Sequence, residues 1–225
     1  MKKLLLIVTF VFILHTCSMA SSLIEDLLKD LKSDNPNIRR NAAGMLGKMG
    51  DNSAVDSLIE ALKDQDSGVR SAAADSLGYF TDEKIINPLV ETLKDTDPEV
   101  RACSADSLAA ISGDKLVSAI MEILADRDPS VRYRVLQSLS YLPSPPPKDP
   151  VLKTLKDDYP EVRQQAVRLL SFYGTEAAEN IAGASQDSDV RVRSSVVEAM
   201  ASIGGPKALD TIIKALSDTD TDIRA

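Results

Sequence analysis

The side chains best suited to chemistry are unevenly distributed along this chain of 225 residues. The single histidine, His15, and one of the two cysteines, Cys17, lie among the first twenty residues, so Cys103 is the only thiol beyond them. A metal centre needs clustered His, Cys or carboxylate ligands, and a cysteine nucleophile needs a base beside it. No such pattern accompanies Cys103. We therefore expect no catalytic residue, no metal site and no cofactor, and we interpret Cys103 as a structural thiol.

Paired aspartates and single arginines recur through the rest of the chain. Asp64 and Asp66 form one such pair, and Asp95 and Asp97 form the next. The arginines stand at intervals of 31, 31, 31, 31, 30 and 31 residues, at Arg39, Arg70, Arg101, Arg132, Arg163, Arg193 and Arg224. This regularity favours a structural role, in which aspartates cap helices and each arginine pairs with an aspartate of a neighbouring turn. A calcium site and a basic binding stripe are the alternatives.

The period predicts a pair of helices in each repeat. Val or Ile precedes each arginine, and an Asp or Asn stands four residues before most of them. Pro follows that position in four repeats, once after Tyr159. An Asp or Asn followed by Pro is typical of a helix N-cap and first helical position. Apolar residues three, four and seven positions after the arginine form one stripe, as in Ala73, Ala74 and Leu77. We expect six helix pairs and a partial seventh over residues 21–225, an all-α fold.

The segment from Asp95 to Leu108, which approaches the pattern D-x-D-P-x-V-R-x-x-A-A-x-x-L-G, resembles the HEAT repeats called PBS-lyase HEAT-like repeats. The resemblance extends over about residues 22–225. It implies a right-handed α-solenoid, a HEAT-like superhelix, whose second helices line a concave surface, but no particular activity. The related deoxyhypusine hydroxylase uses His-Glu pairs to hold two irons, and the absence of His after His15 excludes that activity.

The first twenty residues are expected to form a secretory signal. Lys2 and Lys3 precede an apolar run from Leu4 to Leu14, which is too short to span a bilayer comfortably. Cleavage after Ala20 is the first interpretation; lipidation at Cys17 and an uncleaved anchor are the others. Each places the remaining chain outside the cytoplasm, in contact with a membrane only through this segment or its lipid.

Composition narrows the class of partner. The formal net charge of −8 argues against nucleic acid, which needs a concentrated basic surface. A hydrophobic content of 44% is sufficient for a sizeable core.

The segment 143–150, PSPPPKDP, keeps the repeat spacing and is expected to be a stiff turn, with the next helix beginning at Pro150 or Val151.

A candidate binding surface follows from the second helices. Positions one, two and five residues after each arginine are expected to face solvent on the concave side. In repeats 4 and 5 these positions carry Tyr133, Arg134, Gln137, Gln164, Gln165 and Arg168. Tyr and Arg are enriched at interface centres, although variable surface positions also drift. The sequence thus predicts a non-enzymatic extracytoplasmic interaction scaffold that binds a protein or an acidic peptide. A lyase-like subunit handling a tetrapyrrole and a structural spacer are the alternatives.

Overall fold

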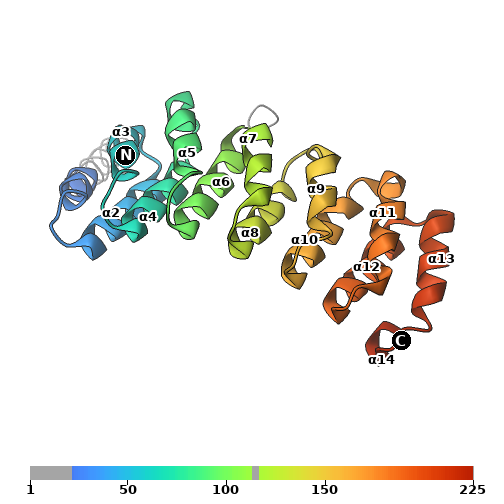
Figure 1. Cartoon of the computed structure of the whole chain (residues 1–225). Helices are drawn as coiled ribbons and strands as arrows, with labels where there is room; N and C mark the ends of the chain where they lie inside the picture. Colours follow the sequence, from blue (N-terminus) through green and yellow to red (C-terminus); the bar gives the residue numbers. More distant parts are fainter. Residues whose placement is uncertain (1–21, 113–116, 225) are drawn as a thin grey trace, which may run out of the picture. The chain divides into compact units, whose positions relative to one another are not determined.

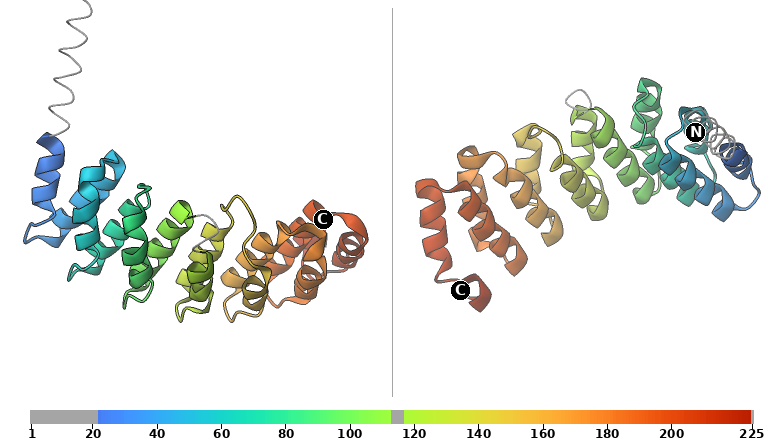
Figure 2. Two further views of the ribbon diagram at one scale, coloured as in Figure 1. Left: turned by 90° about the horizontal axis from the view of Figure 1, so that it is seen from above. Right: turned by 180° about the vertical axis from the view of Figure 1, so that it is seen from behind.

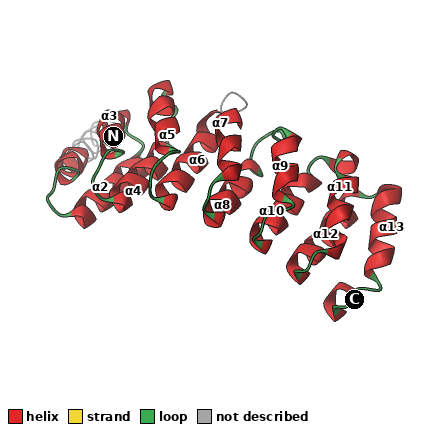
Figure 3. Cartoon of the chain, in the orientation of Figure 1, coloured by secondary structure: helices red, strands yellow, loops and turns green. Residues whose placement is uncertain are grey.

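The computed structural model describes residues 22–112 and 117–224, and these residues form helices joined by short turns (Figure 1). Within these ranges the backbone contains no β-strand (Figure 3). The chain divides into two compact units, Met1–Ser107 and Leu108–Ala225, with the boundary inside one helix. The expected all-α repeat fold is confirmed. The predicted signal segment 1–20, with Cys17, lies outside the described residues.

Unit 1 is built from helix pairs in which a short first helix precedes a longer second one. In chain order its helices cover residues 22–30, α2 (Pro36–Met49), α3 (Val55–Ala61), α4 (Ser67–Leu77), α5 (Ile86–Thr92) and α6 (Pro98–Ser112), whose last residues belong to unit 2. The 3₁₀ turns η1 (Asn52–Ala54) and η2 (Glu83–Ile85) lead into α3 and α5. The second helix α4 packs against both α2 and α3, which is the stacking of an α-solenoid.

Unit 2 repeats this arrangement. Its helices are α7 (Val117–Glu122), α8 (Pro129–Leu139), α9 (Lys148–Thr154), α10 (Pro160–Ser171), α11 (Ala178–Gly183), α12 (Val190–Ile203), α13 (Gly205–Ala215) and α14 (Thr221–Arg224), with η4 (Ile123–Ala125), η5 (Gly174–Glu176) and η6 (Ala184–Gln186) between them. Within this unit the second helices α8, α10 and α12 form one row, and the first helices α7, α9 and α11 form the other (Figures 1 and 2). The helix α10 packs against both α8 and α12.

The second helices begin where the sequence predicts. The Asp66 carboxylate accepts the N–H of Val69 at 3.1 Å, and Asp128 accepts that of Ser130 at 2.9 Å. The helix α10 differs, because Tyr159 occupies its N-cap position without a side-chain hydrogen bond to the helix. The apolar stripe is confirmed as well, since Ala73 and Leu77 are fully buried.

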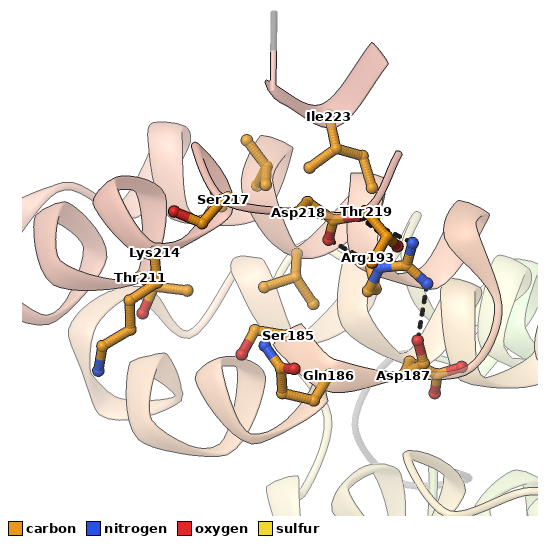
Figure 4. Close-up of a pocket in the computed structure, with 13 residues that line it drawn as sticks. Ser185, Gln186, Asp187, Arg193, Thr211, Lys214, Ser217, Asp218, Thr219 and Ile223 are labelled. Carbon is orange, nitrogen blue, oxygen red and sulfur yellow. Dashed lines mark hydrogen bonds and ion pairs between the residues drawn. The ribbon is translucent and has the colours of Figure 1, made fainter. Parts of the chain in front are cut away.

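Arginines join the turns of neighbouring repeats. Arg132 donates from Nε and Nη2 to the two carboxylate oxygens of Asp157 at 2.6 and 2.7 Å, and from Nη1 to the carbonyl of Asp126 at 2.6 Å. The Asp157 carboxylate also accepts the backbone N–H of Tyr159 at 3.0 Å. The same ion pair recurs as Arg39–Asp64, Arg70–Asp95, Arg163–Asp187 and Arg193–Asp218. Figure 4 shows Arg193 between Asp218 and Asp187. We call these five pairs the arginine ladder.

The arginine ladder is largely shielded from solvent, so it is structural. The side chains of Arg132 and Asp157 are 11% and 9% exposed. Burial of Asp157 favours a higher pKa, but hydrogen bonds from Arg132 and from the Tyr159 N–H outweigh it and lower the pKa. Hydrogen bonds from Arg193 and the Asp220 backbone likewise lower the pKa of Asp218 to about 2. The predicted pairing is confirmed for these five pairs, and the alternative of a basic binding stripe is wrong for their arginines.

Close contact between second helices of unit 1 depends on glycine. A Cβ on Gly47 would lie 2.5 Å from the Cβ of Ser76, whose Oγ donates to the carbonyl of Ala43 at 2.9 Å. The same contact recurs 31 residues later, where a Cβ on Gly78 would lie 2.7 Å from the Oγ of Ser107. Gly47 thus lets α2 and α4 approach more closely than a larger side chain would permit, and Gly78 does the same for α4 and α6.

The helix after the proline-rich segment corrects one expectation. The helix α9 begins at Lys148, two residues before the expected Pro150. Pro150 then occupies the third helical position, where a backbone N–H has no intrahelical partner to lose. The Tyr173 hydroxyl donates to the carbonyl of Pro146 and fixes the preceding turn, and burial raises the pKa of Tyr173 to about 12. No helix in the described ranges has the length and apolar character needed to cross a membrane.

The arginine ladder yields a stability prediction. Asp157→Ala removes the carboxylate that Arg132 and the Tyr159 N–H share, and leaves a shielded guanidinium without its ion pair. We expect the free energy of unfolding to fall by about 2–3 kcal/mol, measured by urea denaturation followed by circular dichroism. The control Asp158→Ala removes an adjacent exposed aspartate and should change stability by less than about 0.5 kcal/mol. Equal urea midpoints for the two variants would contradict a structural ladder.

The glycine contact yields a second prediction. Gly47→Ala places a methyl group against Ser76, so we expect the free energy of unfolding to fall by about 1–3 kcal/mol despite the better helix propensity of Ala. Gly44→Ala lies in the same helix with nothing within 4 Å of the new methyl group. This control should be neutral or stabilising by about 0.5–1 kcal/mol. Stabilisation by both substitutions, in calorimetry, would show that α2 and α4 are not held this closely.

Candidate binding groove

The predicted surface residues are distributed over two adjacent second helices, but they are not equally exposed. Gln137 on α8 and Arg168 on α10 are exposed, and both line one groove. Tyr133, Arg134 and Gln164 are half-buried and do not line it. The structure therefore brings part of the predicted set together.

Gln165 corrects the expected pattern, because it is only 6% exposed. Its Nε2 donates to the Oγ of Ser140, beside α8, at 3.4 Å, whereas the Nε2 of Gln164 donates to the Oγ of Ser195 on α12 at 3.2 Å. Position two after the arginine thus faces a neighbouring helix rather than solvent, and Ser195, at the same position of the next repeat, is 2% exposed. The two glutamines connect α10 to the helices on either side of it.

A groove of about 420 Å³ runs across α8, α10 and α12. We call it the second-helix groove. It is lined by Gln137, Ser140, Tyr141, Gln165, Arg168, Ser171, Phe172, Ser195, Glu198, Ala199 and Ser202. All of these residues belong to unit 2. Its lining combines hydroxyls and amides with two aromatic rings and two charged groups of opposite sign.

The aromatic rings of the groove were missed in the sequence analysis. Tyr141 is 80% exposed and Phe172 is 62% exposed. Each stands nine residues after its ladder arginine, just past the exposed positions that the single-helix pattern identifies. The signal was present in the sequence, because Tyr79 occupies the same position in unit 1 and is 61% exposed. Comparison of this position between repeats finds all three rings.

The charged groups of the groove contrast with the charges around it. Arg168 and Glu198 are exposed, and neither makes an ion pair with another described residue. Arg191, near the start of α12, is engaged, because it contacts Glu161 at 3.0 Å and Asp189 at 2.8 Å. These contacts raise the pKa of Arg191 and hold that of Asp189 at about 2. Arg168 and Glu198 are therefore available to pair with the charges of a ligand, whereas Arg191 is already engaged.

Two other hollows of unit 2 are weaker candidates. The pocket of Figure 4, about 250 Å³, is lined by ladder residues such as Arg193 and Asp218, whose charges are already paired. A hollow of about 610 Å³ beside α9 is mostly apolar, with Met121 and Leu124 in its lining, and its Asp157 belongs to the arginine ladder. The second-helix groove alone among these three combines exposed aromatic rings with exposed charges.

Catalytic chemistry has little support in the described residues. No group of three or more His, Cys, Asp or Glu side chains there is arranged to hold a metal ion. Cys103 is 6% exposed, and its Sγ lies 3.6 Å from a carboxylate oxygen of Glu99. It lies in unit 1 and is not part of the second-helix groove.

Comparison with known proteins agrees with this architecture. A family model described as HEAT repeats matches residues 17–78, 55–140, 117–181 and 149–225. The crystal structure of YibA from E. coli superposes with a TM-score of 0.68 at 19% identity, covering 92% of this chain and 82% of that one. An engineered protein gives a TM-score of 0.52 at 22% identity, covering 89% of this chain and 65% of that one.

A third structure, the complex of CpcE and CpcF of phycocyanin lyase from Nostoc sp., gives a TM-score of 0.47 at 23% identity, covering 89% of this chain and 73% of that one. At 19% and 22% identity, the likenesses to YibA and to the engineered protein show the fold alone. No curated protein matches the chain significantly in sequence.

Paired glutamine substitutions test the corrected surface. Gln165→Glu places a carboxylate at a buried position whose side-chain partner is a single hydroxyl, so we expect a loss of about 2 kcal/mol in the free energy of unfolding. Gln137→Glu makes the same change at an exposed position and should alter stability by less than about 0.5 kcal/mol. Urea denaturation at pH 7 measures both. An unaffected Gln165→Glu variant would show that this side chain is open to solvent rather than enclosed between the helices.

Proposed function

The chain belongs to the HEAT repeat family, and we propose that it is a non-enzymatic interaction module that holds a protein partner in the second-helix groove. HEAT arrays present extended surfaces rather than a fixed catalytic site. The observation that carries the proposal is the pair of exposed rings, Tyr141 and Phe172, which border the same groove as Arg168. Aromatic and Arg side chains supply most of the energetic centres of protein interfaces.

The surroundings of the rings support this assignment. Serines and glutamines line the groove together with the aromatic and charged groups, so the polar atoms of a partner can find hydrogen-bonding groups there while the partner covers the rings. The alternative of a lyase-like subunit that handles a tetrapyrrole has less support, because Cys103 is buried outside the groove. Tyr141 and Phe172 supply aromatic surface, yet no thiol accompanies them in the groove lining.

The proposal also includes a location outside the cytoplasm. Its support is the sequence of the first twenty residues, with Lys2 and Lys3 before the apolar run from Leu4 to Leu14. The partner is accordingly sought among proteins of the cell envelope. The intact mass of the protein isolated from that fraction distinguishes a chain beginning at Ser21 from a lipidated chain beginning at Cys17 and from an uncleaved chain.

Removal of the two rings tests the function. The double variant Tyr141→Ser/Phe172→Ser should reduce partner capture from a cell-envelope fraction at least tenfold, because truncated interface aromatics commonly cost about 2 kcal/mol or more. Both side chains are exposed, so the fold should persist, and circular dichroism verifies it. Capture is quantified by mass spectrometry against the unaltered chain.

The matched control for this experiment is Tyr79→Ser. Tyr79 is an exposed aromatic residue at the equivalent repeat position, but it belongs to unit 1 and does not line the groove. Capture by this variant should equal that of the unaltered chain. If the double variant and the control retain the same proteins in the same amounts, the groove is not the binding site.

A further inference from the structure

The second-helix groove carries two opposite charges in equivalent positions of adjacent repeats. Arg168 stands five residues after Arg163 on α10, and Glu198 stands five residues after Arg193 on α12. Both side chains are exposed, both line the groove, and among the described residues neither is consumed by an ion pair. Opposite charges that line one groove and remain unpaired are available to a ligand that offers the complementary charges.

The spacing of the helices determines what kind of ligand reaches both charges. Packed helices lie about 8–10 Å apart, so equivalent positions on α10 and α12 are separated by roughly that distance. An extended peptide advances about 3.3 Å per residue, so three residues span about 10 Å. A peptide that crosses α10 and α12 therefore places two side chains, three residues apart, above Arg168 and Glu198.

The aromatic rings fit the same path. Phe172 follows the last residue of α10 and Tyr141 lies just beyond α8, so both rings border the groove beside the charged positions. Apolar side chains between the two charged residues of a peptide can cover Phe172, and one that precedes the residue above Arg168 can cover Tyr141. Ser140 and Ser171 also line the groove, and because their hydroxyls donate to the carbonyls of Leu136 and Arg168, their Oγ atoms remain able to accept a backbone N–H of a peptide.

We propose that the second-helix groove recognises an extended peptide segment of its partner in which an acidic and a basic side chain stand three residues apart, with apolar residues between them. The acidic side chain pairs with Arg168 and the basic one with Glu198. This inference rests on the proposed function and narrows the partner class. It differs from a purely acidic peptide, which Glu198 and the net charge of −8 would oppose.

A panel of four peptides tests the charge preference. Fluorescein-labelled Ser-Gly-X-Pro-Leu-Z-Gly-Ser carries Asp and Lys at X and Z in all four combinations, so either chain direction is sampled. We expect at least one mixed-charge peptide to bind the full chain about tenfold more tightly than the doubly acidic or doubly basic peptide. Fluorescence anisotropy at 50 and 300 mM NaCl measures the dissociation constants, and the preference should shrink at the higher salt concentration.

Reversing the charge at Arg168 or at Glu198 should change which peptide of the panel binds most tightly. Arg168→Glu makes both positions acidic and should select the doubly basic peptide, whereas Glu198→Arg should select the doubly acidic one. The double variant Arg168→Glu/Glu198→Arg should return to mixed-charge peptides. The control Lys63→Glu reverses an exposed charge of unit 1 and should leave the order of affinities unchanged. Circular dichroism of each variant establishes that the helices persist.

The outcomes separate this inference from the proposed function. The proposed recognition of mixed-charge peptides is wrong if the order of affinities is the same in the unaltered chain and in both single reversals. It is also wrong if no peptide binds at millimolar concentration. The proposed function still stands in that case if Tyr141→Ser/Phe172→Ser loses the captured partner, which then docks through a folded surface. If partner capture also survives the loss of both rings, both proposals fall.

Discussion

In each ladder pair, one guanidinium bonds to the turn of its own repeat and to an aspartate in the turn of the next repeat, and this double contact positions neighbouring helix pairs. Arg39 donates from Nη1 to the carbonyl of Ser33 in its own repeat at 2.8 Å, and from Nε to Asp64 in the next repeat at 2.7 Å. Bidentate pairing tolerates little displacement, so it fixes each helix pair against the next within a unit. The one shortened repeat fits this constraint. Arg163 and Asp187 are 24 residues apart where other pairs are 25 apart, so the deletion precedes the turn and the pairing is kept.

The residues that hold the repeats together are those of the arginine ladder, at one edge of each repeat, and those of the buried apolar stripe. The exposed positions of the second helices are therefore able to change without affecting the stack. Five residues after the ladder arginine, unit 1 has Gly44 and Asp75, whereas unit 2 has Gln137, Arg168 and Glu198. The two units share a fold and differ in the chemistry they present, which is how a repeat family acquires separate binding specificities.

Features that recur in every repeat could be predicted from the sequence, whereas features that depend on packing against an adjacent helix could not. Helix starts, caps and ladder pairs follow from local spacing, so they could be read from one chain. Gln165 was misplaced because a single-helix pattern cannot tell solvent from an adjacent helix, and Ser140 lies beside that position. Tyr141 and Phe172 were missed because they lie just beyond the regular helix ends, where periodicity stops. The early start of α9 at Lys148 depends on which helical positions tolerate proline.

Local and long-range electrostatics act differently on a ligand of this groove. The whole chain carries a net charge of −8, which repels acidic ligands at a distance and attracts basic ones. At physiological salt this field decays over about 8 Å, so contacts within the groove decide which bound ligand is stable. There Arg168 favours an acidic side chain and Glu198 a basic one. A segment with both charges is attracted at short range at each position and, having little net charge, is not excluded on approach. A purely acidic segment meets opposition at both stages, and a purely basic one faces Arg168 once bound.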